Sequence, residues 1–294
     1  YVQISREKCG NNLMLYLVGT PIGNLADFSA RAKEILSSVD VIACEDTRRT
    51  GMLLAAFDIH NKLMSYHEHN RVKQGEQIIR MLHEGKNIAL VSDAGMPCIS
   101  DPGETLVAAC AQEKIEISVV PGPVAGISAL ALSGLDSTHF FFEGFLPSSG
   151  KPRRERLDVL TTLTCTCILY EAPHRLLKTL TDFVDTGLGD RKIAVCRELT
   201  KKYEEVLRGS VEESREHFAA IPPKGEFVLV ISGADKQNLS KPELTQENKE
   251  MRIRELHSEG LSTKAISQIL SQEWNESKKS IYAYVIKMLQ CPET

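Results

Sequence analysis

The sequence predicts two α/β domains with a cleft between them, followed by a small helical domain. Three observations lead to this prediction. Short apolar runs alternate with helical patterns from Met14 to about residue 134, strands dominate from residue 135 to 235, and residues 245–294 show helical periodicity alone. We take these three ranges as the domain boundaries.

Residues 14–134 read as an alternation of strands and helices. The β-branched runs "MLYLV", "DVIAC", "NIALVS" and "IEISVV" predict strands, and "DFSARAKEILSSV", "RVKQGEQIIRMLHEG" and "GETLVAACAQEK" repeat apolar residues with helical spacing. Asp27 and Ser29 are candidate N-caps of the first helix, and Gly85 follows the second. This alternation predicts a mainly parallel sheet with helices on its faces.

Residues 135–235 predict a mixed sheet. Their strands are "HFFFEGFLP", "TCTCILYEAP", "KIAVCREL", "EEVLRGSV" and "EFVLVIS", of which the third and fourth are joined by a short polar loop. A polar linker then leads to three helices, "EMRIRELHSEG", "STKAISQILSQEW" and "SKKSIYAYVIKMLQ", with Ser262 and Ser277 as caps. This tail resembles a helix-turn-helix, which predicts RNA docking; a bundle that only packs on the main body is the alternative.

The composition argues against a membrane protein, a secreted protein and a zinc protein. Hydrophobic residues make up 42% of the chain, yet no apolar run reaches the length of a membrane span. The start lacks a secretory signal, and we expect residues 1–13 to be an extension outside the fold. The eight cysteines form no CxxC pair, which favours free thiols, a cytoplasmic protein and no zinc site, and His67 and His69 read as ordinary loop residues. With a net charge of −4, any nucleic-acid contact must come from local basic patches.

Glycine and proline cluster where four predicted strands end. The segments are "VGTPIGNL" (18–25), "SDAGMPCISDPG" (92–103), "VPGPVAGIS" (120–128) and "YEAPHR" (170–175). Ligands of α/β sheets bind at the carboxyl ends of the strands, so these loops together predict a ligand cleft. Neither the lysine of a P-loop nor a GxGxxG pattern is present, which favours recognition of an uncharged adenosyl or amino-acid moiety by backbone groups.

The order of these motifs resembles a known family. "LYLVGTPIGNL", "CEDTRRT", "SDAGMPCISDPG", "VPGPVAGISAL", "FEGFLP", "YEAPHRL", "CRELTKKYEE" and "GEFVLVI" are similar, in this order, to the ribosomal RNA small-subunit methyltransferase I family of the tetrapyrrole methylases. The resemblance implies S-adenosylmethionine-dependent 2′-O-methylation of a cytidine ribose in small-subunit ribosomal RNA, free or in the assembled subunit. It also implies two α/β domains of the tetrapyrrole-methylase type with the cofactor in the cleft, a homodimer and no membrane partner.

The resemblance also implies the cofactor-binding residues. Met96 and Cys98 stand where the family pattern leads us to expect Thr and Leu, and Val124 replaces a small or polar residue, so side-chain contacts there do not transfer. Backbone contacts tolerate such changes. The implied cofactor-binding residues are Pro21, Gly23, Asp93, Ala94, Gly95, Ile99, Val124, Ala125, Gly225, Glu226 and Phe227.

Methyl transfer to a hydroxyl requires alignment of the reacting atoms and removal of a proton, and it needs no metal. Asp46 or Glu45 could orient or deprotonate the ribose, and a lysine between carboxylates could prepare the hydroxyl, because its pKa shifts readily when it is desolvated. Two alternatives stay open: a self-neutralised helix start capped by Thr47, and an ion-pair network that ties the two domains together. The candidate catalytic residues are Asp46, Glu171, Glu198 and Lys201.

RNA binding requires local positive charge. The run "GKPRRER" (150–156) opens a predicted helix, and the tail helix adds Lys278, Lys279, Lys287 and the stacking candidate Tyr282. The candidate RNA-binding residues of the α/β part are Arg48, Arg49, Lys151, Arg153, Arg154, Arg156, His174 and Arg175.

Two rival functions remain at this stage. One keeps the fold and methylates a tetrapyrrole precursor, although a small macrocycle needs neither the basic run nor the helical tail. The other is a nucleic-acid-binding regulator whose α/β part senses a small molecule; it predicts duplex DNA binding by residues 245–294 and no methyl transfer.

Overall fold

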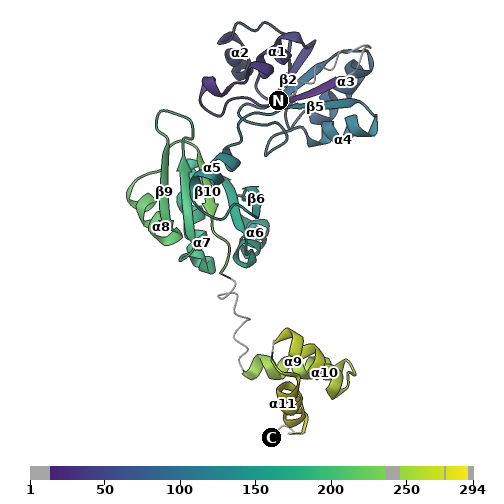
Figure 1. The fold of residues 1–294 in the computed structure, drawn as a ribbon, viewed down its shortest axis with the longest axis vertical. Helices are drawn as coiled ribbons and strands as arrows, with labels where there is room; N and C mark the ends of the chain where they lie inside the picture. Colours follow the sequence, from purple (N-terminus) through teal and green to yellow (C-terminus); the bar gives the residue numbers. More distant parts are fainter. Residues whose placement is uncertain (1–13, 236–245, 275, 291–294) are drawn as a thin grey trace. The chain divides into compact units, whose positions relative to one another are not determined.

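The computed structural model describes residues 14–235, 246–274 and 276–290. They form two compact units that divide after Ala234 (Figure 1). The first unit contains two five-stranded sheets, and the second contains three helices. Among the described residues no helix is both long and apolar enough to cross a membrane.

The first sheet is parallel throughout and has the strand order β3-β2-β4-β1-β5. The carboxyl ends of its strands therefore lie along one edge of the sheet. The strands are β1 (Met14–Val18), β2 (Val41–Cys44), β3 (Leu63–Ser65), β4 (Ile88–Val91) and β5 (Glu116–Val120).

Helices cover both faces of this sheet. Ala32, Leu36 and Leu54 pack on one face, while Ile78, Leu82 and the α4 residues Leu106 and Cys110 pack on the other. The covering elements are η1 (Leu25–Asp27), α1 (Ala30–Ser38), α2 (Thr47–Ala55), α3 (Arg71–His83) and α4 (Glu104–Gln112).

The second sheet is mixed, with the order β6-β7-β10-β8-β9. Only β6 and β7 run parallel; β10 is antiparallel to β7 and β8, and β9 is antiparallel to β8. Its strands are β6 (Phe140–Phe145), β7 (Thr166–Glu171), β8 (Lys192–Arg197), β9 (Glu205–Ser210) and β10 (Phe227–Ile231).

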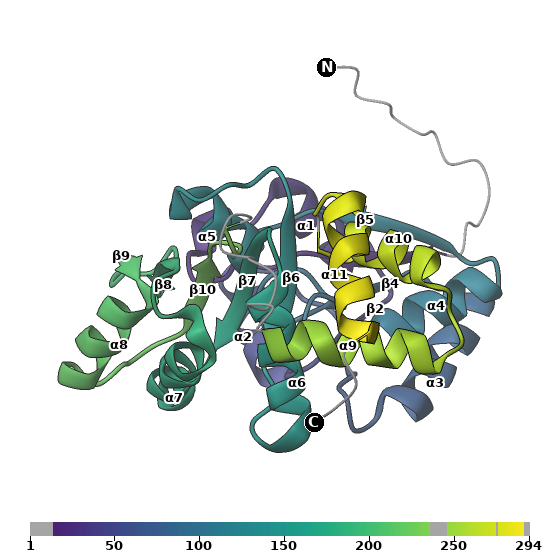
Figure 2. The ribbon, with the colours of Figure 1, turned by 90° about the horizontal axis from the view of Figure 1, so that it is seen from below.

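Four helices cover the second sheet. The apolar helix α5 (Ala125–Ser133) packs on one face, and α6, α7 and α8 pack on the other (Figure 2). The bounds are α6 (Gly150–Thr162), α7 (Pro173–Phe183), the short η2 (Val184–Leu188) and α8 (Val211–Ala220).

The second unit has its own core. Ile253, Ile266, Leu270 and Trp274 are buried together with Ile281 and Val285. Ser262 and Ser277 cap the second and third helices, as predicted, because their hydroxyls accept from the backbone N–H groups three residues on. The helices are α9 (Gln246–Ser258), α10 (Thr263–Glu273) and α11 (Lys278–Gln290).

The parallel first sheet and mixed second sheet confirm the strand predictions, but several elements were not predicted. They include the short strand β3, the short helix η1 and the helices α5 and α8. The expected cap at Thr47 is wrong, because Asp46 caps α2 by accepting from the N–H of Arg48. Ser29, not Asp27, caps α1. All six cysteines within the described residues are free thiols, while Cys9 and Cys291 lie outside them.

Candidate functional site

Three glycine-rich loops of the first sheet are joined by backbone hydrogen bonds. The N–H of Gly19 donates to the carbonyl of Val120 at 3.0 Å, and Thr20 and Gly95 exchange two bonds of 2.8 and 3.2 Å. The buried Thr20 hydroxyl also donates to the carbonyl of Ser92 at 3.2 Å. The loops after β1, β4 and β5 therefore form one rigid surface at the carboxyl edge.

Glycine is required at two points of this surface. A Cβ on Gly19 would lie 2.6 Å from the Cα of Gly122, so the first and third loops can touch only without side chains there. Gly95 has a φ of +88°, a backbone conformation that side chains disfavour. The sequence signal of clustered glycines thus has a steric cause.

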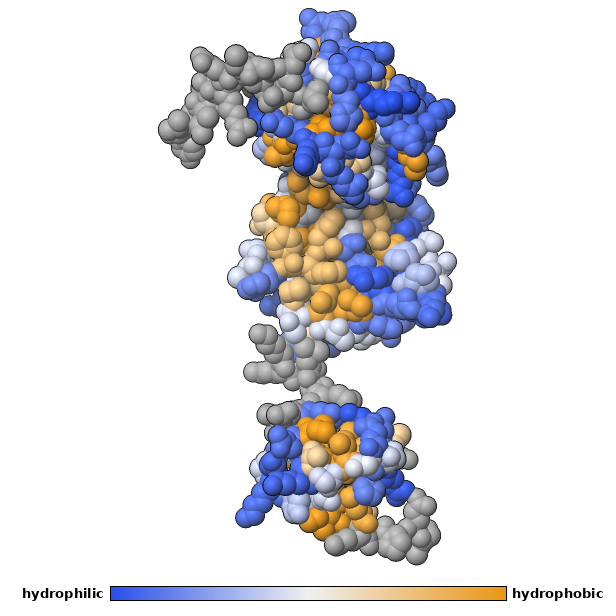
Figure 3. Space-filling view, turned by 90° about the vertical axis from the view of Figure 1, so that its right-hand side faces the viewer, coloured by the Kyte–Doolittle hydropathy of each residue, from blue (hydrophilic) through white to orange (hydrophobic). Residues whose placement is uncertain are grey.

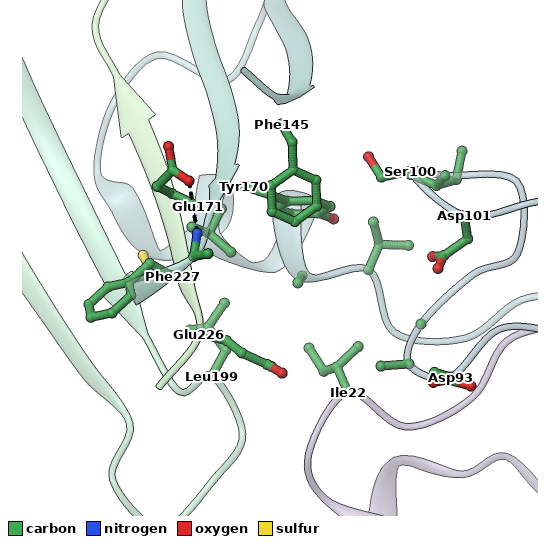
Figure 4. Close-up of a pocket in the computed structure, with 18 of the residues that line it drawn as sticks. Ile22, Asp93, Ser100, Asp101, Phe145, Tyr170, Glu171, Leu199, Glu226 and Phe227 are labelled. Atoms are coloured by element: carbon green, nitrogen blue, oxygen red, sulfur yellow. Dashed lines mark hydrogen bonds between the residues drawn. The ribbon is translucent and has the colours of Figure 1, made fainter. Parts of the chain in front are cut away.

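A cavity of about 360 Å³ opens between these loops and the second sheet (Figure 4). This volume is within the usual range of small-molecule sites. Its two sides come from different sheets. The first wall consists of Ile22 and residues 93–96, 99–101 and 124–125, and the second wall of Phe145, Cys196, Leu199 and residues 170–173 and 226–228.

Most of the residues that sequence similarity assigned to the cofactor line this cavity. Three do not: Pro21, Gly23 and Gly225. Gly23 and Gly225 instead permit close packing, since a Cβ would lie 2.5 Å from Lys201 Cγ in one case and 2.6 Å from Glu198 Cγ in the other. The cofactor candidates that line it are Asp93, Ala94, Gly95, Ile99, Val124, Ala125, Glu226 and Phe227.

The structure adds lining residues that sequence reasoning missed. Ile22, Ser100 and Asp101 belong to loops already singled out, so their position in those loops was the available signal. Tyr170 lies in "YEAPHR", and its hydroxyl accepts from the N–H of Gly126 at 3.1 Å. Phe145 packs against it with ring centroids 5.6 Å apart, and nothing in an apolar strand marks such a residue as part of a site.

Glu171 is the only one of the four catalytic candidates that lines the cavity. Its carboxylate is buried and fully engaged: the N–H of Ala172 and the hydroxyl of Thr179 donate to it at 2.9 and 2.6 Å, and Arg175 pairs with it at 3.3 Å. In Figure 4 the side chain turns away from the open part of the cavity. Such a group holds the β7–α7 junction in place.

Lys201 lies between two carboxylates. Its ammonium donates to Glu198 at 3.0 Å and to Glu226 at 2.9 Å. Burial alone would lower the pKa of Lys201, but both hydrogen bonds and both negative charges outweigh it and raise the pKa. The raised pKa favours the cationic form of Lys201, which suits a positioning role between the two carboxylates, and its catalytic role stays a prediction.

Asp46 and Asp93 hold the two arginines of "CEDTRRT". Asp46 pairs with Arg48 at 3.0 Å, and Asp93 with Arg49 at 3.2 Å. Hydrogen bonds from Arg48 lower the pKa of Asp46 to about 2, which makes it a weak base. The self-neutralised helix start is thus present, with Asp46 in place of Thr47 as its cap.

The basic run at the start of α6 divides into buried and exposed groups. Arg153 is 4% exposed and donates to Asp182, Thr179 and the carbonyl of Pro147. The predicted role of Arg153 in RNA binding is wrong, because its guanidinium is buried and donates all of these hydrogen bonds inside the protein. Arg156 pairs with Glu143, whereas Arg154 and Lys151 are exposed.

The other predicted RNA contacts at the β7–α7 junction also differ in accessibility. Arg175 is mostly buried, pairs with Glu171 and donates to the carbonyl of Leu146. His174, the residue before it, is exposed on the first turn of α7.

Sequence comparisons place the chain among known proteins. The family model described as Tetrapyrrole (Corrin/Porphyrin) Methylases matches residues 14–214. The Ribosomal RNA small subunit methyltransferase I of Synechocystis sp. is 46% identical over 276 residues, covering 94% of this chain and 98% of that protein. The protein of the same name from Bacillus subtilis is 43% identical over 277 residues, covering 93% and 94%.

Solved structures share the fold at low sequence identity. A cobalt precorrin-4 methyltransferase matches with a TM-score of 0.58 and 17% identity, covering 77% of this chain and 98% of that one. A uroporphyrin-III C-methyltransferase from Thermus thermophilus, complexed with S-adenyl homocysteine, matches with a TM-score of 0.53 and 17% identity, covering 74% and 97%. These likenesses establish the architecture of the two sheets.

Proposed function

Because the chain belongs to the ribosomal RNA small subunit methyltransferase I family, we propose that it transfers a methyl group from S-adenosylmethionine to the 2′-hydroxyl of a cytidine ribose in small-subunit ribosomal RNA. The observation that carries the proposal is the cavity between the two walls. One side of it consists of the loops after β1, β4 and β5, and the other side carries the aromatic residues Phe145 and Tyr170 and the carboxylates of Glu171 and Glu226.

The residues that line the cavity suit this cofactor. Ala94 and Gly95, which have little or no side chain, line one wall, and the carboxylates of Asp93 and Glu226 on opposite walls complement a cationic ligand. Tyr170 and Phe145 give the second wall the apolar surface that an adenosyl group needs. When bound, the cofactor supplies the activated methyl group.

The charged groups of the second wall position the site. The buried Glu171 fixes the start of α7, and the Glu198–Lys201–Glu226 triad fixes the loop that packs against Gly23. We assign them to alignment of the reacting groups, which can account for several kcal/mol of an enzymatic barrier.

We propose that the exposed cations carry the RNA contacts. Lys151 and Arg154 on α6 and His174 on α7 are accessible, as are Arg48 and Arg49, whose side chains are 88% and 67% exposed. In the second unit, α11 carries Lys278, Lys279 and Lys287, and its Tyr282 is 44% exposed and available for stacking.

We also propose a homodimer formed through an apolar surface on the first unit. Val119 on the edge strand β5 and Phe140 on the edge strand β6 are 50% and 43% exposed, and the α5 residues Ile127 and Leu132 are also exposed. Figure 3 shows an extended apolar area on this unit. Exposed apolar side chains at the edges of two sheets suit burial against a second copy.

The free thiols of the described part of the chain agree with a reducing compartment, and we place the protein in the cytoplasm. The function is tested by radiolabelled methyl transfer to assembled small subunits, to free small-subunit RNA and to a tetrapyrrole precursor. We expect label in one of the RNA substrates, at a cytidine that resists alkaline cleavage. Label in the tetrapyrrole alone would overturn the proposal.

A further inference from the structure

The loop that joins β8 and β9, residues 198–204, begins at the cavity. Leu199 lines the second wall, and Figure 4 shows it on the same side as Glu226, across from Asp93. Lys201, two residues further on, donates to Glu226 at 2.9 Å. Residues just beyond Lys201 therefore lie beside the opening of the cavity.

Internal bonds and close packing hold this loop in one conformation. Glu198 and Thr200 have φ values of +49° and +65°, and strain of this kind persists only where the surrounding structure holds it. The N–H of Thr200 donates to the Glu204 carboxylate at 2.6 Å, and the N–H of Glu204 donates to the carbonyl of Lys201 at 3.2 Å. On the side of the first sheet, a Cβ on Gly23 would lie 2.5 Å from Lys201 Cγ.

The same loop presents Lys202 and Tyr203 to solvent. Tyr203 is 64% exposed, more than the other stacking candidate, Tyr282, at 44%. The Lys202 ammonium lies 5.6 Å from the centroid of the Tyr203 ring. Within the described part of the chain no ion pair neutralises Lys202, whereas Lys201 beside it is paired with two carboxylates. A rigid loop thus offers one aromatic ring and one cation beside the cavity.

An aromatic ring next to a cation suits single-stranded RNA. Unpaired bases stack on aromatic side chains, which contributes roughly 5- to 150-fold in affinity per base, and a lysine can hold the adjoining phosphate. A second protein is a poorer fit for this loop. Tyr203 is flanked by the exposed charges of Lys202 and Glu204, and charged residues are depleted in the core of protein interfaces.

We propose that Tyr203 stacks on an unpaired base of the RNA substrate while Lys202 contacts a neighbouring phosphate. The inference rests on the proposed function and names the form of RNA that the site takes, a single-stranded segment. With one base held on Tyr203, a nearby ribose is kept within reach of the cavity. Both are positioning residues, and the methyl group and the proton are transferred without contact to either.

Steady-state kinetics compare Tyr203→Ala and Tyr203→Phe with the wild type, using small ribosomal subunits or their RNA as substrate. Tyr203→Ala should raise the KM for RNA by about tenfold and change kcat by less than about threefold, because the ring contributes to binding. Tyr203→Phe keeps the ring and should stay within about twofold of the wild type. Calorimetry with S-adenosylhomocysteine should give the same affinity for all three proteins.

Val159→Ala is the control for removal of an exposed side chain. Val159 is 37% exposed near the carboxyl end of α6, whereas the cavity is lined by the carboxyl ends of β6 and β7. This variant should leave the KM for RNA unchanged.

Lys202→Glu tests the phosphate contact. It should weaken RNA binding about fivefold and lower the salt slope of the affinity by about 1, because one phosphate contact is lost. Tyr203→Ala should keep the wild-type slope, since stacking on a neutral ring releases no counterions. Lys114→Glu makes the same charge change on the turn before β5 and should change neither quantity.

Tyr203→Trp reports stacking directly and also serves if the alanine variant does not fold. The chain has one tryptophan, Trp274, which is buried in the second unit, so the additional fluorescence of the variant belongs to position 203. Small-subunit RNA should quench this signal, because an indole ring stacked on a base loses fluorescence. The variant should methylate RNA at about the wild-type rate, since tryptophan also stacks.

Four outcomes overturn the inference while leaving the proposed function intact. A KM for Tyr203→Ala within about twofold of the wild type would show that the ring does not contribute to binding. An equal loss in Tyr203→Phe would assign the effect to the hydroxyl. Unquenched fluorescence of RNA-bound Tyr203→Trp would exclude stacking. A changed oligomeric state of Tyr203→Ala in sedimentation would place the ring between two copies of the chain. A wild type that methylates neither RNA substrate would contradict the proposed function itself.

Discussion

The two walls of the cavity are stabilised by different interactions. The first wall is held by backbone bonds and close glycine contacts, such as those of Gly19 and Gly95, and it leaves Asp101 without a partner within the described residues. In the second wall, the charged groups Glu171 and Glu226 are both engaged by cations.

This difference suggests that the two walls have different roles in the site. Loops joined by backbone hydrogen bonds give a ligand a rigid surface, and the Asp101 carboxylate on that surface has no cation as a partner among the described residues. A paired carboxylate is a poor base, because its partner stabilises the charged form. We therefore expect the first wall to bind the ligand and the second wall to align the reacting groups, which four substitutions can test.

The largest effect should come from breaking the network behind the second wall. Arg153→Ala removes the guanidinium that holds Asp182 and Thr179, and Thr179 in turn donates to Glu171. Removing one partner of a buried ion pair costs about 3–5 kcal/mol, so we expect a loss of about 3 kcal/mol in the free energy of unfolding.

Chemical denaturation measures this loss, and the neighbouring Arg154→Ala is the control. Arg154 is exposed, so its removal should change the free energy of unfolding by less than about 0.5 kcal/mol. Equal stability of the two variants would contradict a structural role for Arg153.

Substitution of two glycines with nearly equal φ tests whether the glycine-rich loops of the first wall bind the ligand. Gly95 (+88°) is in the cavity and Gly85 (+89°) follows α3, where an added Cβ meets nothing. Each substitution by Ala should cost about 1–2 kcal/mol of stability, because the left-handed conformation disfavours a side chain.

Only Gly95→Ala should also weaken binding of S-adenosylhomocysteine, by about 10-fold, or roughly 1.4 kcal/mol. Its Cβ would add volume to the wall of the cavity, in contact with Ile22 and the carbonyl of Pro123 at 3.4 Å, whereas Gly85 lies outside the cavity. Calorimetry measures the affinity of both variants for S-adenosylhomocysteine. Equal affinities would show that the loop around Gly95 does not contribute to binding.

Sequence reasoning was most successful where periodicity or glycine spacing decides the structure. The alternation of strands and helices predicted both sheets, and the loops at residues 18–25, 92–103 and 120–128 meet because their strands are parallel neighbours in one sheet. The short β3 was missed because three residues contain no period to detect.

Pairing of charges could not be predicted from the sequence. Arg153 and Arg154 are adjacent and chemically identical, yet the 100° rotation between helical neighbours buries one and exposes the other. Asp101 and Asp93 occur in one loop, and only the tertiary structure gives a cation to one and none, among described residues, to the other. Sequence reasoning therefore found the loop and overlooked the acid.

A smaller effect concerns stability and pH. The folded-state pKa of Asp101 is raised to about 7, so its contribution to stability is full below the unfolded pKa and is lost between about pH 4 and 7. Asp101→Asn cannot ionise, and it should be more stable than the wild type by about 1 kcal/mol at pH 8. The difference should vanish near pH 4 in denaturant titrations; a constant difference would mean that this carboxyl does not bind its proton more tightly in the folded state.

The smallest effect concerns Arg154, an exposed cation of α6. Arg154→Glu should weaken binding of small-subunit RNA about fivefold and reduce the salt slope of the affinity by about 1, because one phosphate contact is lost. Lys114→Glu makes the same charge change just before β5, at the sheet edge opposite the cavity, and should leave both quantities unchanged. Titrations of labelled RNA at several salt concentrations compare the two variants. If Lys114→Glu weakened binding as much as Arg154→Glu, the RNA would respond to net charge alone, and α6 would have no specific part in RNA binding.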